Sequence, residues 1–166
     1  MLQGIRYGLA VCALLWGVAS AASDPVAAPV VQPIGEATTE PMILTVTAQG
    51  KTMDSAIAAL TQAIVSHNYT FVRQQAIDNR LVPYAQEVRS VRLVYFCNFA
   101  KMDRALHLDP RATQMLPCRV TLVETPEGVD LIAVNPAWVS QSIPGLHAEC
   151  QELKRDYQGI LEEASL

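Results

Sequence analysis

The sequence lacks the signature motifs of the common enzyme classes. Its 166 residues contain no GxSxG nucleophile motif, no HExxH zinc motif, no Walker phosphate-binding loop and no GxGxxG dinucleotide motif. Basic residues are also few, with 12 Lys and Arg against 16 Asp and Glu and a net charge of −4. Because nucleic-acid recognition requires a clustered basic surface, this balance argues against a nucleic-acid partner. No enzyme class is indicated, and a non-catalytic protein is favoured.

Long hydrophobic runs are absent apart from one short run near the N-terminus. Residues 9–18 are apolar except for one glycine, follow Arg6 and precede an Ala-Ser-Ala triplet. A bilayer span needs about 20 apolar residues, whereas this pattern is typical of a secretory signal peptide. We expect cleavage of residues 1–21, a periplasmic or secreted protein, and no membrane span after cleavage. The alternative, lipid attachment at Cys12, is disfavoured because the apolar run continues past that cysteine.

A proline-rich segment separates the predicted signal peptide from the rest of the chain. Residues 22–41 are rich in Ala, Val and Pro and follow neither a helical nor a strand period. Proline removes a backbone donor, and the residue before it avoids the helical conformation. We therefore expect an extended linker. Residues 42–166 are enough for one domain with a core of its own.

Hydrophobic periodicity predicts a single α+β domain with the order βαββαββ and an additional C-terminal helix. Alternating apolar residues predict strands over 43–47, 69–76, 88–96, 119–124 and 129–134. Apolar spacings of three and four predict helices over 53–65, 98–108 and 145–164, with a loop over 78–86. Strands joined by hairpins favour a mainly antiparallel sheet with the helices on one face.

Local signals mark the ends of several of these segments. Thr52, Asn98, Asp109 and Asn135 each stand where a helical segment begins, and each can accept a hydrogen bond as an N-cap. Gly128 closes a four-residue turn between two strands, where a positive φ is often required. These positions fix the boundaries that hydrophobic periodicity alone leaves open.

Short motifs in a fixed order resemble those of a known family. They are Ala76-Ile77-Asp78-Asn79, Phe96-Cys97-Asn98-Phe99, Asp109-Pro110-Arg111, Leu116-Pro117-Cys118-Arg119-Val120, an acidic hairpin at 124–128, and Asn135-Pro136. Over residues 44–139 the chain resembles the domain of unknown function 302 family. Asn79 stands where many members have histidine, and Phe99 stands where proline is usual. The resemblance implies a small α+β domain and no established reaction.

Cysteines are the first candidates for chemistry. Cys97 ends one predicted strand and Cys118 precedes the next, so antiparallel pairing would bring them together at one edge of the sheet. Export favours a structural disulfide between them, which requires Cα atoms within about 7 Å. A free or redox-active thiol pair is the second alternative, although no CxxC motif is present. Cys150 lies on the apolar stripe of the last helix and is expected to be buried and unpaired.

A metal or haem site is the third alternative for the same cysteines. His107 is the nearest additional ligand in sequence, but a single histidine at a helix end is more typical of a cap or a solvated residue. No CxxCH motif supports covalent haem. We therefore predict no cofactor.

Two further residues are candidates for ligand binding. Asn98 could hold a ligand, although helix capping accounts for it, and Arg119 could bind an anion or lower the pKa of the neighbouring thiol. Trp138 and Tyr157 are expected to pack in the core or at its edge and not to form a binding site. The leading interpretation is an exported, non-catalytic binding or accessory domain with a small ligand or another periplasmic protein as partner. The alternative is a thiol-dependent redox or sulfur- or metal-handling protein that uses Cys97 and Cys118.

Overall fold

The computed structural model describes residues 40–77 and 91–166. The elements in chain order are β1 (Ile43–Gln49), α1 (Met53–Ser66), β2 (Thr70–Ala76), β3 (Val91–Cys97), α2 (Phe99–Leu108), the 3-10 turn η2 (Pro110–Met115), β4 (Cys118–Thr125), β5 (Gly128–Val134), α3 (Pro136–Val139), the 3-10 turns η3 (Ser140–Ser142) and η4 (Pro144–Leu146), and α4 (His147–Ser165). The predicted signal peptide, most of the predicted linker and the predicted loop at 78–86 lie outside the described residues.

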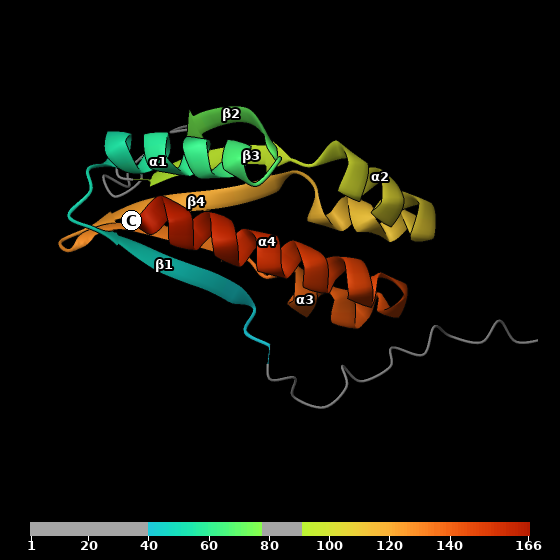
Figure 1. Ribbon diagram of the computed structural model, residues 1–166. Coiled ribbons are helices and arrows are strands. Elements are labelled where there is room, and N and C mark those ends of the chain that lie inside the picture. Colours follow the sequence, from blue (N-terminus) through green and yellow to red (C-terminus); the bar gives the residue numbers. More distant parts are fainter. Residues whose placement is uncertain (1–39, 78–90) are drawn as a thin grey trace, which may run out of the picture. The chain divides into compact units, whose positions relative to one another are not determined.

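The described strands form one antiparallel sheet in the order β1-β5-β4-β3-β2. Helices α1 and α4 lie side by side against one face of this sheet (Figure 1), and their apolar residues enter the same core. The prediction of an α+β domain with helices on one face and a C-terminal helix is confirmed. Strands β3 and β4 lie inside the sheet, each with a neighbour on both sides.

The predicted capping residues all act as caps. Oxygen atoms of Thr52, Asn98, Asp109 and Asn135 accept hydrogen bonds from backbone N–H groups of the first helical turn that follows each of them. Gly128 adopts a φ of 151°, and a Cβ atom there would lie 2.2 Å from the carbonyl oxygen of Ala48. Only glycine fits that close approach. The caps and the turn could be predicted from the sequence because each depends on residues that are close together in the chain.

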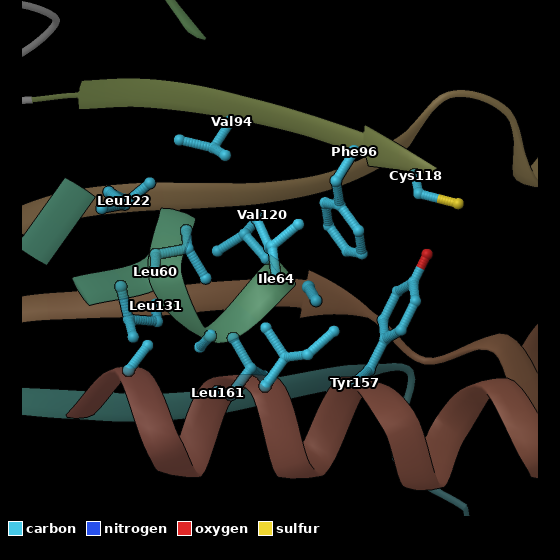
Figure 2. Packing of buried hydrophobic residues seen from close by; sticks show 14 of the residues in the cluster. Leu60, Ile64, Val94, Phe96, Cys118, Val120, Leu122, Leu131, Tyr157 and Leu161 are labelled. Atoms are coloured by element: carbon cyan, nitrogen blue, oxygen red, sulfur yellow. The ribbon is translucent and has the colours of Figure 1, made fainter. Parts of the chain in front are cut away.

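Side chains alternate along β4 between the two faces of the sheet. Cys118, Val120 and Leu122 are buried towards the helices, whereas Arg119 is exposed on the opposite face. Phe96 of β3 pairs with Cys118 in register and is fully buried. Figure 2 shows these strand residues meeting Tyr157 and Leu161 of α4 and Leu60 and Ile64 of α1. The main core is therefore formed between the inner face of the sheet and these two helices.

The apolar stripe of α4 contributes to two separate clusters. Leu153, Tyr157 and Ile160 pack in the main core. Leu146 and Cys150 belong to a second cluster with residues of α2 and the turns around it, Ala105, Ala112 and Ile143. The spacing of its apolar residues predicted the stripe. It did not predict that the N-terminal end of the stripe packs on α2 and the neighbouring turns instead of the sheet.

Two residues at the end of the predicted linker contact the folded domain. Glu40, within the predicted linker, pairs with Lys154 of α4 through a contact of 2.7 Å between carboxylate oxygen and Nζ. The side-chain amide of Asn135 donates to the carbonyl oxygen of Pro41 at 2.7 Å. These two contacts attach residues 40 and 41 to the domain. The hydrogen bond with Lys154 is the largest cause of a lowered pKa at Glu40.

Candidate functional site

Cys97 and Cys118 lie at the same end of two neighbouring strands. Cys97 is the last residue of β3, and Cys118, the first residue of β4, is paired with Phe96. Both are buried, with 7% and 2% of their surface exposed. The predicted meeting of the two cysteines at the strand ends is confirmed, and both strands lie inside the sheet.

The predicted disulfide between these two cysteines is absent from the structure, where both are free thiols. Cys97 stands one position beyond the residue paired with Cys118, at the end of β3. Both side chains enter the main core cluster, so the two thiols lie next to each other without a bond between them.

The two thiols differ in their preferred protonation state. Hydrogen bonding with Cys97 is the largest cause of a lowered pKa at Cys118; burial opposes it, and hydrogen bonding with Tyr157 adds to it. The pKa of Cys97 is raised, first by its hydrogen bond with Cys118 and then by burial. Cys118 is therefore the sulfur that ionises first, while Cys97 retains its proton and donates it. Since the thiolate is the nucleophilic form, Cys118 is the candidate reactive cysteine.

Tyr157 reaches this thiol pair from α4. Figure 2 shows its hydroxyl directed towards the sulfur of Cys118. Its ring lies against Phe96, with ring centroids 5.3 Å apart, and Phe96 in turn meets Tyr69 at 5.5 Å. Burial, followed by the charge of Cys118, raises the pKa of Tyr157 well above its ordinary value. Tyr157 is thus a protonated hydrogen-bond donor for a Cys118 thiolate.

A polar network fixes the turn of α4 that carries Tyr157. The hydroxyl of Tyr69 donates to Asp156 Oδ2 at 2.6 Å, and Lys101 of α2 forms ion pairs with Asp156 and with Glu152, the latter at 2.7 Å. Burial and the hydrogen bond with Asp156 raise the pKa of Tyr69. Lys101 also has a raised pKa, because its hydrogen bonds with the two carboxylates outweigh burial. Clusters of perturbed ionisable groups of this kind are typical of functional sites.

A pocket of about 270 Å³ opens beside the thiol pair. Its lining combines polar and aliphatic side chains and consists of Gln114, Met115, Leu116, Pro117, Arg119, Val134, Pro136, Val139 and Tyr157. Tyr157 therefore contacts both the pocket and Cys118. A shallower groove of about 160 Å³ on the open face of the sheet shares Arg119 and Val134 with it. The candidate site comprises the thiol pair, Tyr157 and this pocket.

Sequence comparison identifies the family. The family described as domain of unknown function DUF302 matches residues 44–164. The chain belongs to the DUF302 family. The match includes α4, which the sequence analysis treated as an extension beyond the family region. It therefore includes Cys97, Cys118 and Tyr157 alike.

A solved structure supports the fold of this DUF302 domain. The crystal structure of an uncharacterised conserved DUF302 protein from Bacillus stearothermophilus has a TM-score of 0.64 and 14% sequence identity. The similarity covers 74% of this chain and 98% of that chain. No curated protein matches the chain. Among the described residues of this DUF302 domain, no helix is long and apolar enough to cross a membrane.

The other predicted site residues are not brought to the thiols. Asn98 caps α2 through a 3.0 Å hydrogen bond from the Lys101 backbone, and its amide donates to the carbonyl oxygen of Asn68 at 3.1 Å. His107 is exposed, and its Nδ1 lies 2.8 Å from the carbonyl oxygen of Asp103. In the part of the chain that is described, no group of three or more His, Cys, Asp or Glu side chains could hold a metal. Arg119 contacts the pocket, on the face of β4 opposite to Cys118.

Tyr157 is the site residue that sequence reasoning missed. Its place on the apolar stripe predicted burial, which is confirmed at 5% exposure. Its second role, hydrogen bonding to Cys118, joins residues that are 39 positions apart in the chain. Neither spacing nor composition signals such a contact. A polar aromatic residue within an otherwise aliphatic stripe was the only available hint, because a buried tyrosine hydroxyl requires a partner.

Cys150 is expected to make the stability of the domain sensitive to alkaline pH. It is fully buried and free, as predicted, and burial raises its pKa from 9.0 to about 11. Between these values the unfolded chain loses the thiol proton while the folded chain retains it, so the stabilising contribution of Cys150 is lost as pH rises. The destabilisation caused by Cys150→Ala should therefore shrink by about 1–2 kcal/mol between about pH 8 and about pH 10.5.

Urea denaturation of the unmodified domain and of Cys150→Ala, repeated across this pH range, measures how the cost of the substitution changes with pH. Leu153→Ala is the matched control, because Leu153 is buried on the same helix but carries no ionisable group. The cost of that substitution should stay constant with pH. A pH-independent cost for Cys150→Ala would show that the Cys150 thiol ionises normally in the folded domain.

Proposed function

We propose that this DUF302 domain is an exported thiol redox protein whose Cys97 and Cys118 cycle between dithiol and disulfide. The observation that carries the proposal is the side-by-side placement of two free, buried thiols whose hydrogen bonds favour a thiolate on one and a thiol on the other. Unequal thiols of this kind suit exchange, because one sulfur attacks and the other resolves. A purely structural role would require no such difference.

The proposed cycle uses a disulfide, RSSR, as the oxidant. Cys118 thiolate attacks one sulfur of RSSR, which breaks the S–S bond, forms a mixed disulfide on Cys118 and releases RS⁻. Cys97 then loses its proton and attacks the sulfur of Cys118, which forms the Cys97–Cys118 bond and releases the second RS⁻. The protein loses two electrons and two protons, and RSSR becomes two RSH.

Export is the second part of the proposal. A signal peptide at residues 1–21 would deliver the thiols to a compartment in which disulfides persist and are exchanged. The intact mass of the exported protein tests this part: a chain beginning near Ala22 supports it, and a chain retaining Met1 contradicts it. Acyl chains on Cys12 would replace it with a lipoprotein.

Oxidation of the purified domain tests the redox part. After full reduction and exposure to 2-hydroxyethyl disulfide, we expect one intramolecular disulfide that joins Cys97 and Cys118 in peptide mapping and is reversed by dithiothreitol. Cys97→Ser should stop at a mixed disulfide on Cys118, whereas Cys118→Ser should react far more slowly. Cys150→Ala, the matched cysteine control, should behave as the unmodified sequence does.

A ligand-binding domain is the second candidate, and the pocket bordered by Tyr157 and Arg119 favours it. In that case Cys97 and Cys118 would remain thiols after equilibration with the oxidant, and replacing both with Ala would leave pocket binding intact. Retention of a soft metal ion by the two thiols, detected by elemental analysis, would instead support metal handling. Either result would overturn the redox proposal.

A further inference from the structure

The pocket is lined by residues that adjoin the reactive cysteine. Leu116 and Pro117, which directly precede Cys118, form part of its wall, and so does Tyr157, whose hydroxyl is directed towards the Cys118 sulfur. Cys118 itself is 2% exposed. A disulfide on the surface of a folded protein cannot reach a sulfur at that depth without large rearrangement. A small molecule seated in the pocket lies against Tyr157, the side chain that hydrogen-bonds to this sulfur.

The volume of the pocket also indicates a small ligand. At about 270 Å³ it lies just below the range of roughly 300–1,000 Å³ that holds drug-sized molecules. One part of its wall is aliphatic, with contributions from Val134, Pro136 and Val139. A compact organic molecule with short methylene chains matches this lining, whereas a peptide chain exceeds it.

Arg119 indicates that the ligand is an anion. It is exposed at the junction of the pocket and the neighbouring groove. Within the described residues it has no ion-pair or hydrogen-bond partner, unlike Arg104 and Arg111, which pair with Glu152 and Asp109. An unpaired guanidinium at the mouth of a pocket is suited to a carboxylate, which it can bind through two parallel hydrogen bonds. The net charge of −4 would otherwise repel an anion.

We propose that the substrate of the thiol pair is a low-molecular-weight organic disulfide that carries carboxylate groups. One carboxylate binds Arg119, the methylene chain lies against the apolar wall of the pocket, and the disulfide is directed towards Tyr157 and the sulfur of Cys118. This inference rests on the proposed redox function and adds the substrate class to it. The exchange reaction is the one already written, with RSSR as this dianionic disulfide.

Three disulfides of similar size but different charge test the substrate class. They are the disulfide of 3-mercaptopropionate, which is anionic, 2-hydroxyethyl disulfide, which is neutral, and cystamine, which is cationic. The rate at which each oxidises the reduced domain is divided by its rate with N-acetylcysteine, which removes differences in intrinsic reactivity. We expect the anionic disulfide to give a normalised rate about tenfold above the neutral one, and the cationic disulfide to give the lowest rate.

Arg119→Gln should remove this preference. It should slow oxidation by the anionic disulfide about tenfold and leave the neutral disulfide within about twofold of its original rate. The matched control is Arg155→Gln, which removes the same charge from an exposed position on α4. It should change all three rates by similar small factors.

The results separate the substrate class from the redox function. Equal normalised rates for the three disulfides, or equal effects of Arg119→Gln and Arg155→Gln, would overturn the substrate class and leave the redox function standing. If none of the three disulfides joins Cys97 to Cys118, the redox function fails and the substrate class fails with it.

Discussion

Replacing Phe96 with Ala is expected to lower the free energy of unfolding by about 3–5 kcal/mol. Phe96 is fully buried at the centre of the main core, and its ring lies between those of Tyr69 and Tyr157, at 5.5 Å and 5.3 Å. The substitution removes both aromatic contacts and leaves a cavity that rigid strands cannot close. Because small domains have stabilities of about 5–15 kcal/mol, urea denaturation at low temperature is the appropriate measurement.

Phe99→Ala is the matched control for this prediction. Phe99 lies three residues further along the chain, begins α2 and is 65% exposed. The same change of side chain there should cost less than about 0.5 kcal/mol, which is typical of surface substitutions. A cost for Phe96→Ala as small as that for Phe99→Ala would mean that the core packs differently from the arrangement in Figure 2.

The cavity at residue 96 should also affect the thiol pair. Phe96 is paired with Cys118 across the strands and supports the ring of Tyr157. Loss of that support frees the tyrosine hydroxyl to leave Cys118. Packing and chemistry are therefore coupled here, because the aromatic cluster that stabilises the sheet also positions the hydrogen-bond donor.

Most of the fold could be predicted from the sequence because its signals are local. The alternation of Val120, Leu122 and their neighbours identified β4, and the stripe from Leu146 to Ile160 identified α4. Helix caps and the turn at Gly128 depend on contacts within a few residues. The meeting of Cys97 and Cys118 was predictable as well, because it follows from antiparallel pairing of consecutive strands.

The rest of the site depends on contacts that no local pattern encodes. Tyr157 and Cys118 belong to elements that meet only when α4 docks on the sheet. The same applies to the hydrogen bond between Tyr69 and Asp156, which are 87 positions apart. The state of the thiols was also not predictable: export favoured a bridge between Cys97 and Cys118, but the two thiols are free and hydrogen-bonded to each other. Hydrophobic periodicity predicts that a side chain is buried. Which other side chains it contacts depends on how the helices pack on the sheet.

Tyr157→Phe is expected to raise the pKa of the first thiol ionisation of the pair by about 1–2 pH units. The hydroxyl of Tyr157 is one of the groups that hold the pKa of Cys118 below its ordinary value, after Cys97. A hydrogen bond to a charged acceptor contributes about 1.5–3 kcal/mol, and one pKa unit corresponds to about 1.4 kcal/mol. The substitution removes the donor while the ring and its contact with Phe96 remain. Ultraviolet absorbance of the thiolate, taken as the difference from Cys118→Ser, follows the titration.

Tyr69→Phe separates this effect from the general loss of a buried hydroxyl. Tyr69 is also buried and also packs on Phe96, but its hydroxyl donates to Asp156 and not to a cysteine. Its replacement should lower stability, because Asp156 loses a hydrogen bond, while the thiol titration moves by less than about 0.5 pH unit. The titrations of Cys97 and Cys118 are coupled, so the pKa shift caused by Tyr157→Phe belongs to the pair of thiols. It should be largest for the first of the two ionisations. Equal shifts in the two variants would show that Cys118 responds to the packing of the aromatic cluster, and the donor role of Tyr157 would be lost.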